Sequence, residues 1–197
     1  MHKIIGYKEI DNYYKVYDKS KQLKRTIAKN QEKTLSEKDW LEGVSCFVIN
    51  EKGKVLIEKR VNKGLTPGKL DLCSGHIDND ETHTQAMIRE LREELGIEIE
   101  ESMNVIRLNL NSVPLEFISS SKKRNFFITF YCLKRDSSEI KMQKEEIEKI
   151  VWLPLEETFQ LIKSGRTKFP TNYDYELIFQ KVRDICEGKS IKGKQER

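Results

Sequence analysis

The sequence predicts an α/β sandwich built on a mixed β-sheet. Three observations carry this prediction. Short apolar runs of strand length recur along the chain, a strongly amphipathic helix lies between them, and two further helices follow the last strand. Helices interleaved with strands pack as layers against a sheet, because each apolar sheet face must be buried against another element.

The first third of the chain is predicted to contain strands and turns. A short strand is expected at 12–18, whereas the polar stretch 21–40 shows no clear periodicity. The apolar runs 44–50 and 54–60 predict two further strands. Gly53 lies in the turn between them, where it can supply a positive φ. We therefore expect a β-hairpin over these two runs.

The strongest helix prediction falls on residues 82–95. One apolar stripe runs along this helix and is formed by Met87, Leu91 and Leu95. Gly96 follows directly and is suited to end a helix. A short strand ending at a glycine is expected just before the helix, at 70–75.

The remaining chain alternates between strands and helices. Strands are predicted at 104–110 and at 125–135, the segment richest in aromatic and β-branched residues. A short strand at 150–153 leads into a helix at about 155–164. A last helix is expected from about 172 to 187.

The length of 197 residues suits one domain with an added edge element. We expect residues 1–40 to form an N-terminal extension, an edge strand or hairpin packed on the main domain. Residues 41–188 would form that main domain. Residues 189–197 are basic and are expected to be a disordered tail.

The composition narrows the class of protein. Hydrophobic residues make up 37% and charged residues 35% of the chain, and the net charge of +4 suits an anionic substrate. No apolar run approaches about 18 residues, so no membrane span is expected. The N-terminus has no secretory pattern. The four cysteines form no CxxC pair, so we expect reduced thiols in a cytoplasmic protein.

Three glutamates on the strong helix carry the chemistry. Glu90, Glu93 and Glu94 stand at i, i+3 and i+4, a spacing that places their carboxylates on one face. Mg²⁺ prefers such oxygen ligands and is usually completed by water and substrate phosphates. Arg89 precedes Glu93 by four residues and can hold its carboxylate in one rotamer. The alternative is a solvated, charged helix face.

The segment before the helix adds two features. Gly75 has no side chain and lets the backbone approach a metal ion closely. The carbonyl of the preceding residue, Ser74, is a further candidate ligand.

The spacing of the whole segment 75–97 decides between these alternatives. It contains Gly75, five residues, Glu81, seven residues, and then the run RELREELGI. This run resembles in full the signature of the Nudix hydrolase (MutT-like) family, G-x5-E-x7-R-E-U-x-E-E-x-G-U, where U is aliphatic. The resemblance extends to most of the chain from residue 41 onward, because the strand pair before the motif and the WLPLEE segment after it also fit.

The resemblance implies a fold, an activity and a cofactor. Nudix proteins form an α/β/α sandwich and hydrolyse the diphosphate bond of a nucleoside diphosphate linked to another group, using Mg²⁺ or Mn²⁺. It implies that Glu90, Glu93 and Glu94 are metal ligands and that Glu93, Glu94 and Arg89 serve catalysis. It also implies that the motif loop is shaped by Gly75, Glu81 and Gly96.

Residues outside the motif complete the candidate site. Some family members take a base or ligand from a loop before a late strand, where Glu146 is the first choice here and Glu145 the second. Either glutamate is equally well explained as part of a solvated loop. Lys59 and Arg60 end a strand near the expected cleft. They either bind the phosphate groups of the substrate or are surface charges at the end of the strand.

A second resemblance is to isopentenyl-diphosphate isomerases, which are relatives of the Nudix hydrolases. It rests on VYDK, VLIEKR and SGHI. That enzyme needs a catalytic cysteine and a histidine-rich metal site. Here Ser74 stands directly before Gly75, and Cys73 is one place off, which on a strand reverses the side-chain direction. Only His76 occupies a matching ligand position.

Other functions remain open at this point. A non-catalytic nucleotide-binding module would use the same fold, but the motif glutamates are all present. An RNA-end hydrolase would want a basic groove with aromatic residues, for which 122–127 is the nearest stretch. We expect a small nucleotide-like diphosphate as the substrate, with no membrane or nucleic-acid partner, and a homodimer is compatible with the family.

Overall fold

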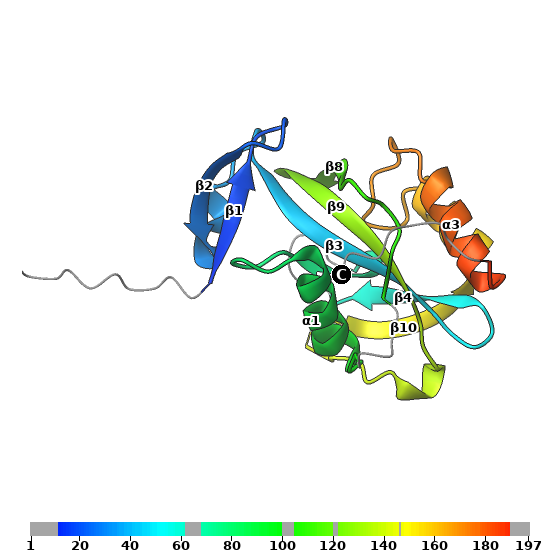
Figure 1. Cartoon of the computed structure of the whole chain (residues 1–197). Coiled ribbons are helices and arrows are strands. Elements are labelled where there is room, and N and C mark those ends of the chain that lie inside the picture. The colour runs from blue at the N-terminus through cyan, green and yellow to red at the C-terminus, as the bar shows by residue number, and fades with distance from the viewer. Residues whose placement is uncertain (1–11, 62–67, 100–104, 120–121, 146, 190–197) are drawn as a thin grey trace, which may run out of the picture.

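A computed structural model describes residues 12–61, 68–99, 105–119, 122–145 and 147–189. A twisted sheet crosses the molecule, with α1 on one face and α2 and α3 on the other (Figure 1). The helices are α1 His83–Leu95, α2 Leu155–Lys163 and α3 Glu176–Cys186, with short 3₁₀ helices at Lys29–Thr34 and Ser137–Glu139. The prediction of an α/β/α sandwich with a mixed sheet is confirmed.

The described strands run through most of the chain. They are β1 Tyr13–Tyr17, β2 Leu23–Ala28, β3 Trp40–Ile49, β4 Lys54–Arg60, β5 Leu70–Asp71, β6 Cys73–His76, β7 Ile106–Arg107, β8 Val113–Ser119, β9 Lys122–Lys134 and β10 Ile147–Pro154.

Strand β3 is the centre of the sheet. It runs parallel to β9 in an unbroken register from Trp40 opposite Asn125 to Ile49 opposite Lys134. It is antiparallel to β1, β4 and β6. Strand β10 pairs with the far edge of β4, and β7 and β8 pair with β9. Both strand orientations are present, so the sheet is mixed.

The sheet divides where β3 and β4 separate. These strands pair at Ile49 and Val55, after which β6 pairs with β3 and β5 pairs with β4. The short segment containing β5 and β6 therefore connects the two diverging strands. The division brings Asp71 and Cys73 beside the face that α1 covers.

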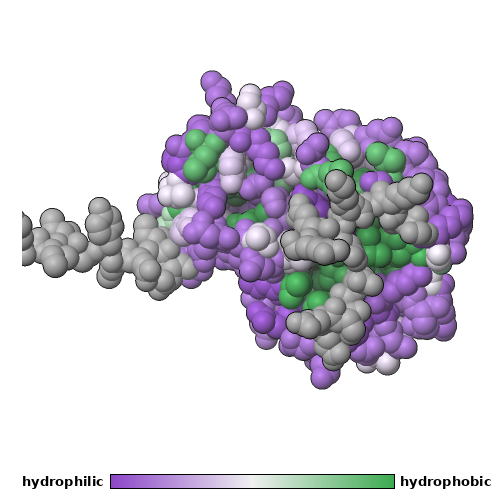
Figure 2. Space-filling model, viewed as in Figure 1, coloured by the Kyte–Doolittle hydropathy of each residue, from purple (hydrophilic) through white to green (hydrophobic). Residues whose placement is uncertain are grey.

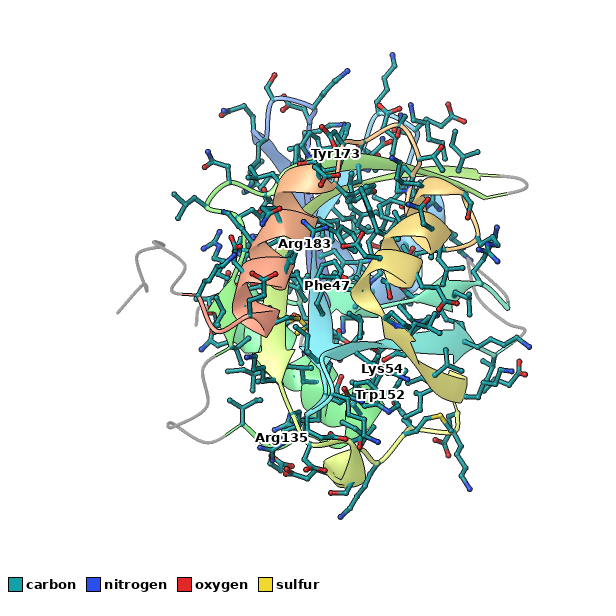
Figure 3. All side chains as sticks on the ribbon, turned by 90° about the vertical axis from the view of Figure 1, so that its right-hand side faces the viewer. Phe47, Lys54, Arg135, Trp152, Tyr173 and Arg183 are labelled. Carbon is teal, nitrogen blue, oxygen red and sulfur yellow. The ribbon has the colours of Figure 1, made fainter. Side chains whose placement is uncertain are left out.

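The two faces of the sheet bury separate clusters of side chains. Phe47 and Ile49 pack with α2 and α3, and the Phe47 and Phe179 rings meet edge to face at 5.2 Å. Figure 3 shows Phe47 between these two helices, and Arg183 of α3 donates a hydrogen bond to Glu156 of α2. On the other face, Val44 and Cys46 pack with the apolar stripe of α1.

Helix α1 is fixed at both ends. The Thr82 hydroxyl accepts a hydrogen bond from the Gln85 N–H, and the Gln85 side chain accepts one from the Thr82 N–H. Gly96 ends the helix with φ 64°, and its N–H donates to the Arg92 carbonyl. The predicted helix at 82–95 and its terminating glycine are confirmed.

Several boundaries differ from the predictions. The stretch 21–40 contains β2, whose side chains are mostly exposed, so it lacks the apolar pattern of a buried strand. The strand expected at 104–110 is limited to β7, and β8 was not predicted. Strand β9 begins at Lys122, three residues earlier than expected.

The N-terminal hairpin of β1 and β2 is attached by a buried carboxylate. Asp39 is 5% exposed, and its side chain accepts hydrogen bonds from Arg25, Lys24 and Ser36. A small apolar cluster lies beneath the hairpin and is formed by Tyr14, Val16, Ile27, Leu35 and Leu41. The hairpin is therefore packed on the end of β3.

The surface is mainly polar. Figure 2 shows that hydrophilic residues cover most of the visible face, with hydrophobic residues gathered beside the grey atoms at the middle right. Among the described residues, no helix is long and apolar enough to cross a membrane.

Candidate active site

The three motif glutamates occupy one face of α1 but differ in burial. The side chain of Glu94 is 3% exposed, that of Glu90 is 12% exposed and that of Glu93 is 49% exposed. The helix therefore carries its carboxylates from the protein interior to the surface within one turn. The predicted alternative, a fully solvated charged face, does not apply to Glu90 and Glu94.

Arg89 joins the acidic groups around α1. Its guanidinium donates to Glu81 at 2.8 Å, to Glu90 at 2.6 Å and to Glu93 at 3.1 Å. It also donates to the carbonyl of His76 at 2.9 Å. Burial opposes its charge, but hydrogen bonds and charges from Glu81 and Glu90 raise the pKa of Arg89, so it stays cationic. The planar guanidinium thus holds several carboxylates in fixed positions.

Gly75 is required by the position of Glu90. A Cβ added at Gly75 would lie 1.8 Å from the Oε1 of Glu90 and 1.9 Å from its Cδ. The Glu90 carboxylate therefore lies against the bare backbone of β6. The missing side chain leaves room for this carboxylate. This explains why the motif has a glycine at this position.

Ser74 reaches Glu94 through its backbone. Its N–H donates to the Oε2 of Glu94 at 3.1 Å. Its hydroxyl turns to the other face of the sheet, 2.9 Å from the hydroxyl of Ser45. In an antiparallel strand the N–H and C=O of one residue point to the same side, so the Ser74 carbonyl is directed toward α1 as well.

Cations and a further carboxylate lie around Glu94. The Nη1 of Arg60 is 3.4 Å from Glu94 and 3.6 Å from Asp71. The Nζ of Lys168 is 2.5 Å from Asp71, which is fully buried. Burial raises the pKa of the Asp71 carboxyl, and Lys168 opposes that shift. Sequence reasoning found Arg60 but missed Asp71 and Lys168, because only the folded sheet brings them together.

Glu58 was also missed. It lies on β4 with 0% exposure, and among the described residues neither carboxylate oxygen has a hydrogen-bond partner. Its carboxylate, the Sγ of Cys73 and the carboxylate of Glu94 lie within 4.8 Å of one another. Burial and the nearby charge of Glu94 raise the pKa of Glu58 well above its usual range.

The sequence predicts that the side chain of Cys73 points away from the catalytic face, whereas the structure places it on that face. Cys73 and Ser74 do point to opposite faces, as strand geometry requires. However, Cys73 is the one whose side chain faces Glu94, because α1 covers that face of β6. The thiol is fully buried. His76 is half-buried, and its ring packs between those of Tyr14 and Phe126 at 4.9 and 5.2 Å.

Lys59 is not brought to this site. The Nζ of Lys59 is 2.7 Å from Glu148 in a partly exposed ion pair, which is the surface role weighed for it. Glu146 lies outside the described residues, and its neighbour Glu145 is exposed.

The donor set fits a divalent cation. Several carboxylates converge here, and Glu58 is buried with no hydrogen-bond partner among the described side chains and backbone. A buried carboxylate is costly unless it is neutral, paired or bound to a metal. The oxygens of Glu90, Glu93 and Glu94 match the preference of hard cations such as Mg²⁺.

A family comparison matches this arrangement. The NUDIX domain model covers residues 40–172, which include β3, β4 and α1. The chain belongs to the Nudix family. It is accordingly a Nudix pyrophosphohydrolase that acts on phosphorus-containing anhydrides, and Nudix hydrolases generally use divalent metals.

Two known proteins are similar to this chain in sequence. The chain is 27% identical to the CTP pyrophosphohydrolase of Escherichia coli K12 over 134 residues, which is 62% of this chain and 94% of that protein. A local match to the isopentenyl-diphosphate Delta-isomerase of Salmonella paratyphi B is 42% identical over 57 residues, 28% of this chain and 32% of that one.

A solved structure supports the Nudix fold. The crystal structure of DR0079 from Deinococcus radiodurans superposes with a TM-score of 0.62 at 22% identity, covering 87% of this chain and 97% of that one. At this level of identity the likeness concerns the fold.

Proposed function

We propose that this Nudix chain hydrolyses the diphosphate bond of a nucleoside diphosphate linked to another group, with Mg²⁺ as the cofactor and Mn²⁺ as a substitute. The observation that carries the proposal is the acidic face of α1, where Glu90, Glu93 and Glu94 are arranged around Arg89. The substrate is a small molecule, and the proposal includes no membrane or nucleic-acid partner.

The positions of the motif residues support a ligand assignment. Glu90, Glu93 and Glu94 would hold the metal, together with the carbonyl of Ser74, which points toward the same helix as its N–H. When bound, a divalent ion polarises the phosphoryl oxygens of the diphosphate and lowers the pKa of the attacking water. Gly75 keeps the space at Glu90 open, and Glu81 holds Arg89 in place.

Positioning and charge compensation are the tasks of the surrounding residues. Arg89 fixes the rotamers of Glu90 and Glu93, so the ligands need little rearrangement on binding. Arg60 lies at the inner end of the carboxylate face, where a guanidinium can bind a phosphate oxygen as a bidentate donor. Glu146 is proposed as the additional base or ligand from outside the motif.

The proposal also covers the organisation of the chain. Residues 41–188 form the hydrolase domain, residues 1–40 are an extension packed on it, and residues 189–197 are a basic tail. Two observations support this division. The N-terminal hairpin contacts the end of β3, and α3 packs into the same core as α2. A homodimer remains part of the hypothesis.

The test is a screen of the purified chain for Mg²⁺-dependent hydrolysis. Substrates would include nucleoside triphosphates with CTP among them, ADP-ribose, dinucleoside polyphosphates, NADH, nucleotide sugars and a capped RNA. We expect release of phosphate, pyrophosphate or a nucleoside monophosphate from one class, with the release lost on chelation. No product from any class, with the protein folded and Mg²⁺ present, would contradict the proposal.

A second candidate is isomerisation of an isoprenoid diphosphate. Two observations favour it, namely the local match to an isomerase and the orientation of the Cys73 thiol toward Glu94. Full burial of that thiol opposes it, because a catalytic cysteine must touch substrate. Isopentenyl diphosphate therefore belongs in the screen, and its conversion without phosphate release would establish this second function.

A further inference from the structure

Glu58 is a carboxylate buried in the sheet without a compensating donor. It lies on β4 with no exposure, and no described residue donates a hydrogen bond to either of its oxygens. A polar group in this situation costs free energy unless something else satisfies it. The Nudix motif does not include this residue, and the proposed hydrolysis does not use it.

A thiol and a second carboxylate lie within coordination reach of Glu58. The Sγ of Cys73 and a carboxylate oxygen of Glu94 lie within 4.8 Å of a Glu58 oxygen and of each other. With ligand-to-metal distances of about 2.0 to 2.3 Å, two ligands of a tetrahedral ion lie about 3.3 to 3.8 Å apart. An inward rotation of these side chains by about an ångström would therefore let all three bind one ion.

We propose that Glu58, Cys73 and Glu94 form a binding position for a thiophilic divalent ion such as Zn²⁺ or Co²⁺. The proposal deepens the proposed function, since Glu94 belongs to both ligand sets. Sulfur is a ligand of Zn²⁺ and similar transition metals, whereas Mg²⁺ takes oxygen ligands. The thiol of Cys73 therefore favours a soft ion here, in contrast to the Mg²⁺ expected at Glu90, Glu93 and Glu94.

The surroundings suit such an ion. All three ligands come from regular elements, namely β4, β6 and α1, and all are buried. The N–H of Ser74 already holds Glu94 in place. On binding, the Cys73 thiol gives up its proton to solvent and its Sγ forms the new bond to the metal. No oxidant or reductant is needed.

Cobalt absorbance tests the sulfur ligand directly. The full-length protein would be freed of metals with a chelator, desalted and titrated with Co²⁺ in the absence of substrate. We expect a thiolate-to-cobalt charge-transfer band in the near ultraviolet that saturates at one ion per chain. We expect Glu58→Gln to weaken Co²⁺ binding by at least about tenfold.

The other cysteines provide matched controls. Cys46 is buried on β3 directly opposite Cys73, and Cys186 is partly exposed on α3. The band should be lost in Cys73→Ala and kept in both Cys46→Ala and Cys186→Ala. A band that survives Cys73→Ala, or none in the wild-type protein, would overturn the proposal.

A second measurement does not depend on folding of the variants. X-ray absorption at the zinc edge of the wild-type protein loaded with one Zn²⁺ should reveal a sulfur neighbour at about 2.3 Å. A shell of oxygen and nitrogen alone would refute the soft site. Because neither measurement uses substrate, their failure is distinguishable from a failure of Mg²⁺-dependent hydrolysis, which the substrate screen detects separately.

Discussion

At the scale of single residues, Glu94 is the motif glutamate with the greatest burial. Its carboxylate accepts a hydrogen bond from the Ser74 N–H and lies beside Arg60. Burial raises its pKa, and the neighbouring charge of Glu90 adds to that shift. An amide at this position would keep the shape and lose the negative charge that a metal ligand needs.

We therefore predict that Glu94→Gln lowers kcat by at least about a hundredfold, since several kcal/mol of charge stabilisation depend on the metal. Circular dichroism and the melting temperature should show that the fold persists. Glu98→Gln is the matched control, because Glu98 is exposed just beyond the same helix, and it should retain activity. If Glu94→Gln kept near wild-type turnover, the assignment of catalysis to this face of the helix would be wrong.

Gly75 offers a different test of the same face. Gly75→Ala would force the Glu90 carboxylate away, because the new Cβ would fall 1.8 Å from Oε1. Glu90 is a flexible side chain, so the fold should survive while Mg²⁺-dependent activity falls by at least about tenfold. If the effect acts through Glu90, the double variant with Glu90→Gln should be no worse than Glu90→Gln alone. Additive losses would show that Gly75 acts independently.

The residue scale also shows what spacing can and cannot predict. Glu90, Glu93 and Glu94 were found because helical periodicity places neighbours in sequence on one face. Glu58, Asp71 and Lys168 come from three separate segments and meet only where the sheet divides. No short-range pattern contains that information. Lys59 and Arg60 are adjacent in sequence, yet only Arg60 points toward Glu94.

At the scale of elements, the end of α1 is sensitive to one glycine. Gly96 has φ 64°, and an added Cβ would lie 2.8 Å from the Cβ of Lys141. Gly53 has a similar φ of 69° with nothing within 4 Å of an added Cβ. The two positions therefore share backbone strain and differ in crowding.

We predict that Gly96→Ala destabilises the protein by at least about 1 kcal/mol more than Gly53→Ala. Both variants carry the cost of a left-handed residue with a side chain, and only Gly96→Ala adds overpacking. Urea unfolding of the two variants measures the difference. Equal free energies of unfolding would mean that Lys141 moves aside without cost.

Element boundaries show the same limits of sequence reasoning. The helix α1 was predicted closely because its apolar stripe, N-cap and terminal glycine agree. Strand β2 was missed because hydrogen bonds to β1, rather than burial of its side chains, account for most of its contacts. Strand β8 was missed for a related reason, since it is an edge strand that contains Pro114.

At the scale of the whole molecule, Asp39 links the N-terminal hairpin to the main sheet. Hydrogen bonds from Arg25, Lys24 and Ser36 hold the pKa of its carboxyl well below the usual range. A group with a lowered pKa in the folded state stabilises the protein above its unfolded pKa, about 3.9. That contribution is lost as the pH falls toward the folded pKa.

We therefore predict that Asp39→Asn costs about 1.5 to 3 kcal/mol at pH 7, the range for hydrogen bonds to a charged group. The gap from wild type should narrow below about pH 4. Urea unfolding at pH 7, 5 and 3 tests this expectation. Glu37→Gln, at an exposed site two residues away, should be nearly silent. A gap that stays constant down to pH 3 would exclude ionisation as the cause.

The parallel pairing of β3 with β9 has a consequence for how the protein is made. Trp40 must find Asn125, far along the chain, before the central ladder can form. Closing so long a loop costs entropy before any contact compensates for it, and proteins rich in such contacts fold slowly. During synthesis, the first hairpins emerge well before β9 exists, and the edge of β3 stays open in the meantime. This interval is when the nascent chain is most exposed to aggregation.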